Sequence, residues 1–176
     1  KNWLLKMLEA IQHHNTIMGV TGSLKPYKKN SLSRLESYLF SDYRGSKKKG
    51  LNHLLNYKWF VLSNTIIKKE LIKRVGLFNE SLEKYGGEDT EMAIRIHQLF
   101  PNGIRQIKDA VAYHMTQKTL DQYLQNMEEY GKYNFPKIIK KHPKFGKDLG
   151  YGLVNSLWGY LLFNPLTRLE VKLYSK

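Results

Sequence analysis

The chain contains no cysteine among its 176 residues. This absence excludes disulfides, thiolate metal sites and cysteine nucleophiles, and it is compatible with a reducing compartment such as the cytoplasm. Any metal ion would have to be held by carboxylate, histidine or backbone oxygen atoms. No secretory leader precedes the first apolar stretch, and Lys1 stands almost inside an expected helix. We therefore expect the chain to be cut from a longer protein.

Acidic residues are scarce relative to basic ones. The chain has 15 Asp and Glu against 29 Lys and Arg, which leaves a formal net charge of +14. Such a surplus favours anionic partners, namely nucleic acid, anionic lipid or phosphorylated substrates, and charge alone does not choose among them. Hydrophobic residues make up 41% of the chain and charged residues 25%, both typical of a globular protein. The length suits one domain or part of one.

The chain also lacks an apolar run that is long enough to span a membrane. The segment from Leu149 to Phe163 carries no charge, but as a helix it would extend only about 22 Å, against a hydrocarbon core of roughly 30 Å. We expect instead a helix that lies in a membrane interface or packs against the domain. Arg168 and Lys172, which follow it, suit an anionic membrane surface.

The spacing of apolar residues predicts a mixed α/β fold. Strand candidates, rich in β-branched and aromatic residues, alternate with segments of helical periodicity. The predicted helices cover residues 3–11, 32–43, 69–75, 88–99 and 120–127. The predicted strands cover residues 17–24, 58–67, 104–107 and 110–114.

A lysine-rich stretch from Gly45 to Gly50 is expected to form a mobile loop. Its three consecutive lysines, Lys47, Lys48 and Lys49, could clamp a diphosphate or an anionic acceptor. A solvated loop that charge keeps soluble is an equally good interpretation of the same residues.

Two adjacent acids, Glu88 and Asp89, follow two glycines and open a predicted helix. A backbone without side-chain bulk lets a substrate approach, and the helix N-terminus favours an ionised carboxylate that can accept a proton. Acids in a first helical turn are also common without any catalytic role, because they complement the helix dipole. Local chemistry leaves both interpretations open.

Four blocks of sequence occur in order along the chain: Asn56–Glu70, Val75–Glu80, Gly86–Glu91 and Ala112–His114. They resemble the second half of the family 2 glycosyltransferases of the GT-A fold. They are also similar to the C-terminal region of galactosyltransferases, and their order and spacing agree with the family over roughly residues 56 to 135. The resemblance implies an α/β fold that is the C-terminal part of a GT-A domain, a mixed sheet with flanking helices and a C-terminal helical extension.

The resemblance also implies roles for individual residues. Asp89 matches the general base that takes the proton of the acceptor hydroxyl in inverting enzymes. Glu88, together with Gly87, matches the position that holds the acceptor sugar. Ser63 and Asn64 match the strand end that lines the acceptor pocket.

A metal ion, Mg²⁺ or Mn²⁺, is implied by the same resemblance. His114 matches a histidine that binds the metal or the donor diphosphate in some relatives, and a histidine bonded at a strand end is the competing interpretation. The chain departs from the family pattern in having no Asp-x-Asp motif and no nucleotide-binding strand-helix units before it. We therefore expect this chain alone to be inactive.

These patterns together predict an acceptor-side part of a glycosyltransferase in residues 1–142 and a helical, membrane-surface extension in residues 143–176. The expected partners are a nucleotide-sugar donor and a glycan or lipid-linked acceptor, at the cytoplasmic face of a membrane. The competing hypothesis is a basic, non-catalytic module that binds nucleic acid or anionic membrane. For Tyr123, helical spacing favours core packing over stacking on nucleic acid.

Overall fold

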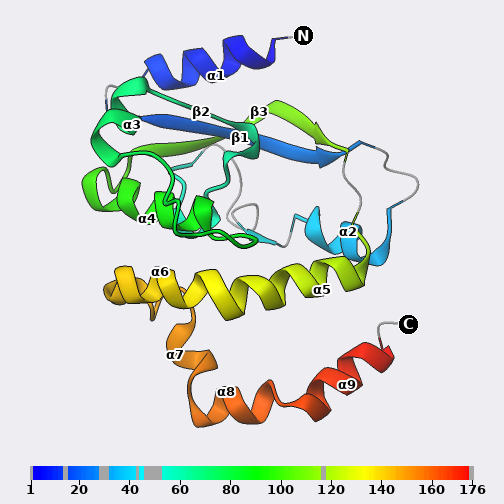
Figure 1. Cartoon of the computed structure of the whole chain (residues 1–176). Helices are drawn as coiled ribbons and strands as arrows, with labels where there is room; N and C mark the ends of the chain where they lie inside the picture. The colour runs from blue at the N-terminus through cyan, green and yellow to red at the C-terminus, as the bar shows by residue number, and fades with distance from the viewer. Residues whose placement is uncertain are drawn as a thin grey trace. The chain divides into compact units, whose positions relative to one another are not determined.

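The computed structural model describes residues 2–13, 16–27, 32–42, 44–45, 53–115 and 118–174, excepting the side chains of residue 168 and residues 171–174 (Figure 1). The chain divides into two compact units, residues 1–135 and 136–176, and each is described by itself. The predicted assignment of residues 1–142 and 143–176 to two parts stays a prediction.

A small mixed sheet of three strands lies at the centre of the first unit (Figure 1). Strand β1, Gly19–Pro26, is central; it pairs antiparallel with β2, Thr65–Ile67, and parallel with β3, Ile104–His114. At the start of β1, Gly19 lies opposite Ile67 on one side and Ile104 on the other. The predicted mixed sheet is therefore confirmed.

The pairing of β1 with β3 contains an irregularity. Thr21 pairs with Gln106, whereas Ser23 pairs with Val111, so extra residues of β3 bulge between these two points. Gly22 stands at the bulge, where an added Cβ would collide with the Ala110 carbonyl. The two strands predicted over 104–107 and 110–114 are thus one continuous strand, and the bulge lies at the gap between the two predicted segments.

The prediction of a continuous strand over 58–67 is wrong over most of its length. Two 3₁₀ turns, η3 at Tyr57–Trp59 and η4 at Leu62–Asn64, occupy most of the segment, and only β2 pairs as a strand. Polar side chains explain the change: Asn56 Oδ1 accepts the Lys58 N–H at 3.0 Å, and Thr65 Oγ1 donates to the Val61 carbonyl at 2.7 Å. Such local bonds compete with strand pairing.

Helices cover both faces of the sheet (Figure 1). Helix α1, Trp3–Gln12, buries Met7 and Ile11 against Val20 and Ala110 of the sheet. Helix α4, Glu88–Leu99, covers the opposite face (Figure 1). Burial of the apolar side chains between the helices and the sheet stabilises the fold. The remaining helices of the first unit are α2 at Arg34–Leu39, α3 at Lys69–Val75 and α5 at Leu120–Glu129.

Helix α2 is shorter than the predicted 32–43. A capping box fixes its start: the Glu36 N–H donates to Ser33 Oγ at 3.2 Å, and the Ser33 N–H donates to Glu36 Oε2 at 2.9 Å. A second capping box between Thr119 and Gln122 starts α5. After α5 the chain widens into a π-helical turn, η5, at Tyr130–Asn134.

The second unit consists of short helices. The uncharged segment predicted as one helix is divided, because Ser156 Oγ accepts the Gly159 N–H at 3.0 Å and Asn164 Oδ1 accepts the Leu166 N–H at 2.8 Å, and each bond starts a new helix. None of the described helices has the length and apolar character needed to cross a membrane. The helical elements from the unit boundary onward are α6 at Phe135–Lys141, η6 at Pro143–Phe145, α7 at Tyr151–Val154, α8 at Leu157–Leu162 and α9 at Pro165–Tyr174.

The predicted fold class is confirmed. The chain is α/β, with a small mixed sheet, flanking helices and C-terminal helices, the arrangement expected of the C-terminal part of a GT-A domain.

Candidate functional site

The candidate site is the N-terminus of α4. Gly86 and Gly87 have φ angles of 77° and 94°, in the left-handed region that residues with a side chain adopt only at a cost. This turn directs the chain into the first helical residues, Glu88 and Asp89, as the sequence predicts. Glu88 is exposed and Asp89 is half-buried. The two acids therefore sit where a ligand can reach the helix end.

A backbone N–H from another segment contacts the Asp89 carboxylate. The Leu62 N–H donates to Asp89 Oδ2 at 3.3 Å, and Leu62 opens the η4 turn. Burial raises the pKa of Asp89 above its ordinary value, the Leu62 hydrogen bond opposes that rise, and the negative charge of Glu88 adds to it. A carboxylate with a raised pKa is a stronger proton acceptor once ionised, so this group is suited to general base chemistry.

The glycine turn is anchored by the π-helical turn after α5. The Asn134 side-chain amide is buried and donates to the Lys84 carbonyl at 2.6 Å and to the Gly86 carbonyl at 2.8 Å. Among the described residues its Oδ1 meets no hydrogen-bond partner. These bonds fix the turn that presents Asp89.

Tyr130, the first residue of the π-helical turn, lies beside the acids. The Tyr130 ring is 3.6 Å from the position that a Cβ on Gly86 would take. The Tyr130 hydroxyl forms a hydrogen bond with the Thr90 side chain. Burial raises the pKa of the Tyr130 hydroxyl; the Thr90 bond opposes this, and the Glu88 charge adds to it. The hydroxyl stays protonated near neutral pH and can donate a hydrogen bond.

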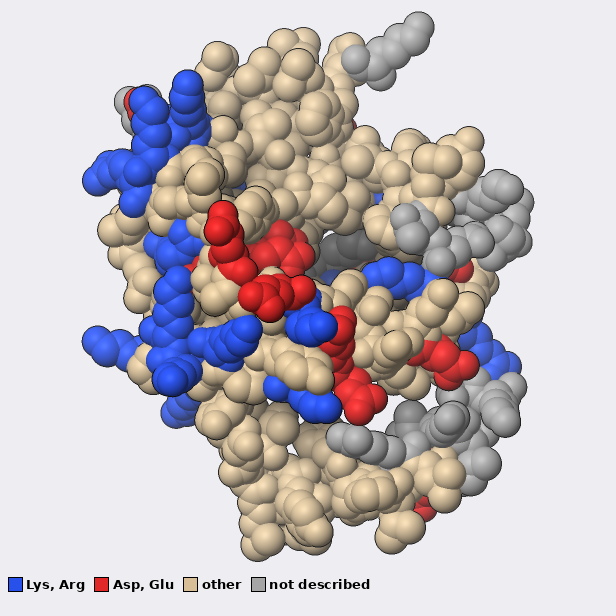
Figure 2. All heavy atoms as spheres, in the orientation of Figure 1, with Lys and Arg blue, Asp and Glu red and all other residues tan. Residues whose placement is uncertain are grey.

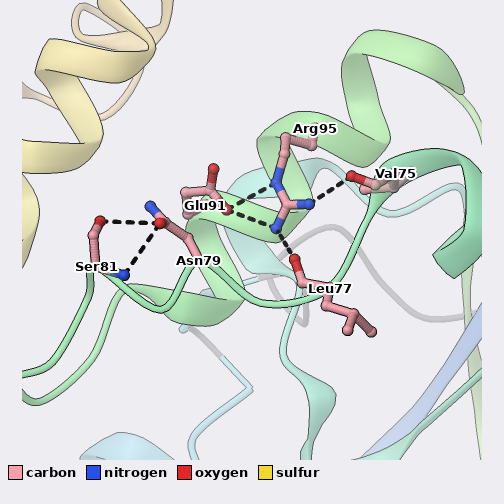
Figure 3. Close-up of polar contacts among 6 residues, drawn as sticks. All are labelled: Val75, Leu77, Asn79, Ser81, Glu91 and Arg95. Carbon is pink, nitrogen blue, oxygen red and sulfur yellow. Dashed lines mark hydrogen bonds and ion pairs between the residues drawn. The ribbon is translucent and has the colours of Figure 1, made fainter.

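Glu91, which the sequence groups with the other acids, points into the protein instead. Its side chain is fully buried, and Oε2 forms an ion pair with Arg95 at 2.8 Å. The Arg95 guanidinium also donates to the carbonyls of Val75 and Leu77, at 2.6 and 2.8 Å (Figure 3). Arg95 therefore holds α4 to the turn after α3, and Glu91, one turn earlier on the same helix, orients the Arg95 guanidinium.

Figure 3 also shows how that turn continues. Asn79 Oδ1 accepts hydrogen bonds from the backbone N–H and the hydroxyl of Ser81, at 3.3 and 2.9 Å. Leu77 and Asn79 both belong to this turn.

The predicted pocket residues Ser63 and Asn64 have different environments. Ser63 is exposed in η4, one residue after the Leu62 N–H that contacts Asp89. Asn64 is buried, and its amide group donates to the carbonyls of Ser23 and Ala110 at 2.9 and 3.0 Å while Oδ1 accepts the Trp3 indole N–H at 2.8 Å. The structure thus brings Ser63 to the candidate site and commits the Asn64 amide to the sheet.

His114 ends β3 and is exposed, with its ring 5.8 Å from that of Phe40. No three His, Asp or Glu side chains gather into a possible metal site within the described ranges. His114 could supply one ligand at most, so the described residues do not by themselves fit Mg²⁺ or Mn²⁺. The predicted diphosphate clamp, Lys47, Lys48 and Lys49, lies outside the described residues.

An open groove of about 780 Å³ lies near the start of β1, and the α4 N-terminus is not part of it. We assign the candidate site by chemistry, since that groove brings together no acid-base pair comparable to Asp89 and its neighbours. The groove residues are Thr16, Met18, Glu70, Arg74, Leu99, Phe100, Pro101, Asn102 and Gly103.

Sequence reasoning missed Tyr130 and Asn134 as parts of the site. Both come from a π-helical turn more than 40 residues after Gly86, and π-bulges occur often at functional sites. The sequence offered only a run of tyrosines among lysines, with no signal for that turn.

Comparison with known proteins gives a limited but relevant match. No protein-family profile matches the chain. Over 57 residues, 32% of the chain, it is 33% identical to the uncharacterized glycosyltransferase YfnE of Bacillus subtilis (strain 168). The match spans 14% of the length of that protein. The chain is therefore similar to a short part of a protein named as a glycosyltransferase.

Proposed function

We propose that the chain is the acceptor-side part of an inverting glycosyltransferase of family 2 with a GT-A fold, and that Asp89 is its general base. The observation that carries the proposal is the half-buried Asp89 carboxylate at the α4 N-terminus, behind two left-handed glycines and next to Leu62 of the η4 turn. The similarity to YfnE supports sugar transfer in general terms. The donor would be a nucleotide-sugar and the acceptor a glycan or a lipid-linked sugar.

The proposed reaction is one in-line displacement. Asp89 accepts the proton of the acceptor hydroxyl, the acceptor oxygen bonds to the anomeric carbon, and the bond from that carbon to the diphosphate oxygen breaks. The products are the glycosylated acceptor and the nucleoside diphosphate, and the proton rests on Asp89. Inversion at the anomeric carbon follows from the single step.

Three neighbours would position the acceptor. Glu88 is exposed beside Asp89 and can accept hydrogen bonds from sugar hydroxyls, and Ser63 can donate from the η4 turn. The Tyr130 hydroxyl, close to Glu88 and Thr90, can donate to the same substrate. Groups that hold the donor diphosphate, including any metal shell, would come from other parts of the complete protein, with His114 contributing at most one ligand.

The test is Asp89→Asn in the complete protein, assayed for transfer from a panel of nucleotide-sugars. We expect turnover to fall by about 10²- to 10⁴-fold, the usual contribution of a general base, with donor binding unchanged. A matched control is Asp121→Asn, because Asp121 is the second residue of α5 just as Asp89 is the second residue of α4, and Asp121 is exposed. Near-normal turnover by the Asp89 variant would refute the assignment.

Stability gives a second readout of the same variant. Because the folded-state pKa of Asp89 is raised, its contribution to stability is present below the unfolded pKa of about 3.9 and is lost as the pH rises through the folded value. The ionised group is therefore a cost at neutral pH. We expect Asp89→Asn to keep or raise the melting temperature at pH 7, so lost turnover cannot be attributed to unfolding.

A further inference from the structure

The helices α7, α8 and α9 expose an unusual number of large apolar side chains. In α8 only Gly159 is buried, whereas Leu157, Trp158 and Tyr160 are 74%, 70% and 73% exposed. Isolated exposed leucines are ordinary, but soluble monomers rarely expose a contiguous apolar surface of this kind. Eleven such side chains fall between residues 151 and 169, namely Tyr151, Leu153, Val154, Leu157, Trp158, Tyr160, Leu161, Leu162, Phe163, Leu166 and Leu169.

These side chains are held in place by well-defined helix starts. Ser156 caps α8, and Asn164 accepts the N–H groups of Leu166 and Thr167 at the start of α9. Gly159 lets α8 approach α7 closely, since an added Cβ would collide with the backbone of Leu153 and Val154. Figure 2 shows the surface of α7 and α8 in tan, without blue or red on the viewed face. The exposed apolar side chains of the second unit therefore lie on helices with defined starts and close packing.

Positive charge lies directly before this surface in the chain. Five lysines occur between residues 137 and 147, and Lys140, Lys144 and Lys147 are exposed. From residue 149 to residue 167 there is no charged residue at all. The second unit therefore combines a lysine-rich segment with an uncharged apolar one.

The sign of that charge selects the occupant of the surface. A second copy of the chain would bring its own lysines to the same interface, and like charges brought together are unfavourable. An anionic lipid surface attracts each lysine and accepts the apolar side chains below its headgroups. Trp158, Tyr151 and Tyr160 are of the two residue types that concentrate at the membrane-water boundary.

We propose that the second unit is a docking surface for an anionic lipid bilayer. The side chains of α7, α8 and α9 insert into the boundary between headgroups and acyl chains, and the lysines of residues 137–147 contact the headgroups. None of the described helices could span the bilayer, so the binding is interfacial. The proposal concerns binding alone and stands whether or not sugar transfer is found.

Co-sedimentation of the 176-residue chain with vesicles tests the proposal. We expect binding to vesicles of phosphatidylcholine with phosphatidylglycerol, and much weaker binding to phosphatidylcholine alone. The double variant Leu157→Ser with Trp158→Ser is expected to lose about tenfold or more in vesicle affinity, because two inserted apolar side chains are removed. The matched control is Leu77→Ser, since Leu77 lies in the first unit and is 74% exposed, as Leu157 is.

The charge component is tested by replacing Lys140, Lys144 and Lys147 with glutamine. This variant should lose affinity for the anionic vesicles only, and its control replaces Lys58, Lys69 and Lys73, which are exposed in the first unit. Circular dichroism checks folding of every variant.

Three outcomes would overturn the proposal. They are equal binding of wild type to both vesicle types, retention of affinity by the Leu157 and Trp158 double variant, and a concentration-dependent dimer, seen by sedimentation velocity, that this double variant abolishes. The last result would assign the surface to a second copy of the chain.

Discussion

At the start of α4, the solvent-facing side and the core-facing side each carry a carboxylate, and the two carboxylates differ in burial and in hydrogen-bond partners. Asp89 is half-buried and receives one N–H at 3.3 Å, whereas Glu91 is fully buried and paired with Arg95 at 2.8 Å. Two residues apart on a helix means about 200° around its axis, so the two acids face opposite directions. Helix position alone therefore does not decide what an acid does; its partners and burial do.

An acid at the start of a helix can be neutralised by a nearby cation or can accept from a backbone N–H group. Glu91 is the first case and Asp89 the second, and removing partners on each side separates the two roles.

The largest expected effect on stability comes from the core-facing side. Arg95→Met removes the cation that pairs with buried Glu91 and takes a donor away from the Val75 and Leu77 carbonyls. We expect the free energy of unfolding to fall by about 3–5 kcal/mol, since breaking a buried ion pair leaves a buried charge. Urea denaturation measures this loss.

A second substitution on the same background separates charge from packing. Adding Glu91→Gln to Arg95→Met should recover part of the lost stability, because the buried charge is then gone. If Arg95→Met alone costs less than about 1 kcal/mol, Glu91 would have to be assigned to the site rather than to the core.

A smaller effect on stability is expected at Asn64, which is buried and hydrogen-bonded, than at Arg95, and almost none at its exposed neighbour Ser63. Asn64→Ala removes partners from the buried carbonyls of Ser23 and Ala110 and from the Trp3 N–H, and should cost about 2–3 kcal/mol in the free energy of unfolding. Ser63→Ala, at an exposed position, should change stability by less than about 0.5 kcal/mol. Equal losses from both variants in urea denaturation would show that the Asn64 bonds do not support the sheet.

Much of the fold could be predicted from local pattern. Amphipathic spacing located α1, α3, α4 and α5, because apolar residues recur at the helical period in the sequence of each. The strand predicted over 58–67 failed because Asn56 and Thr65 bond their own backbone, a preference that apolar patterning does not contain. The single helix predicted over 149–163 failed because Ser156 can start a helix as well as sit inside one.

The family resemblance implied Ser63 and one continuous segment of the candidate site. Gly87, Glu88 and Asp89 form one segment, and family resemblance picked out that segment. The contacts that complete it come from far along the chain: the Leu62 N–H, the Tyr130 ring and the Asn134 amide. The resemblance assigned Asn64 to the pocket, and its sequence position does not disclose that its amide group donates to the Ser23 and Ala110 carbonyls.

The smallest predicted effect concerns the pH dependence of transfer. The activity of a general base falls as the pH drops through its pKa, so the acid limb of kcat/KM reports the raised pKa of Asp89. Burial is the main cause of the rise, and the Glu88 charge adds to it. Glu88→Gln removes that charge, which favours ionised Asp89 and should move the acid limb to lower pH. The measurement is the pH profile of kcat/KM for the complete protein.

The position of the limb distinguishes this electrostatic effect from lost acceptor binding. A weaker hold on the acceptor would lower kcat/KM by the same factor at every pH, whereas a change in the Asp89 pKa displaces the limb. Asp121→Asn, which removes a carboxylate from the matching position of α5, should leave the limb where it is. A limb that moves to higher pH in Glu88→Gln would contradict the assignment of Asp89 as the titrating base, because loss of a neighbouring negative charge cannot raise the pKa of a carboxyl group.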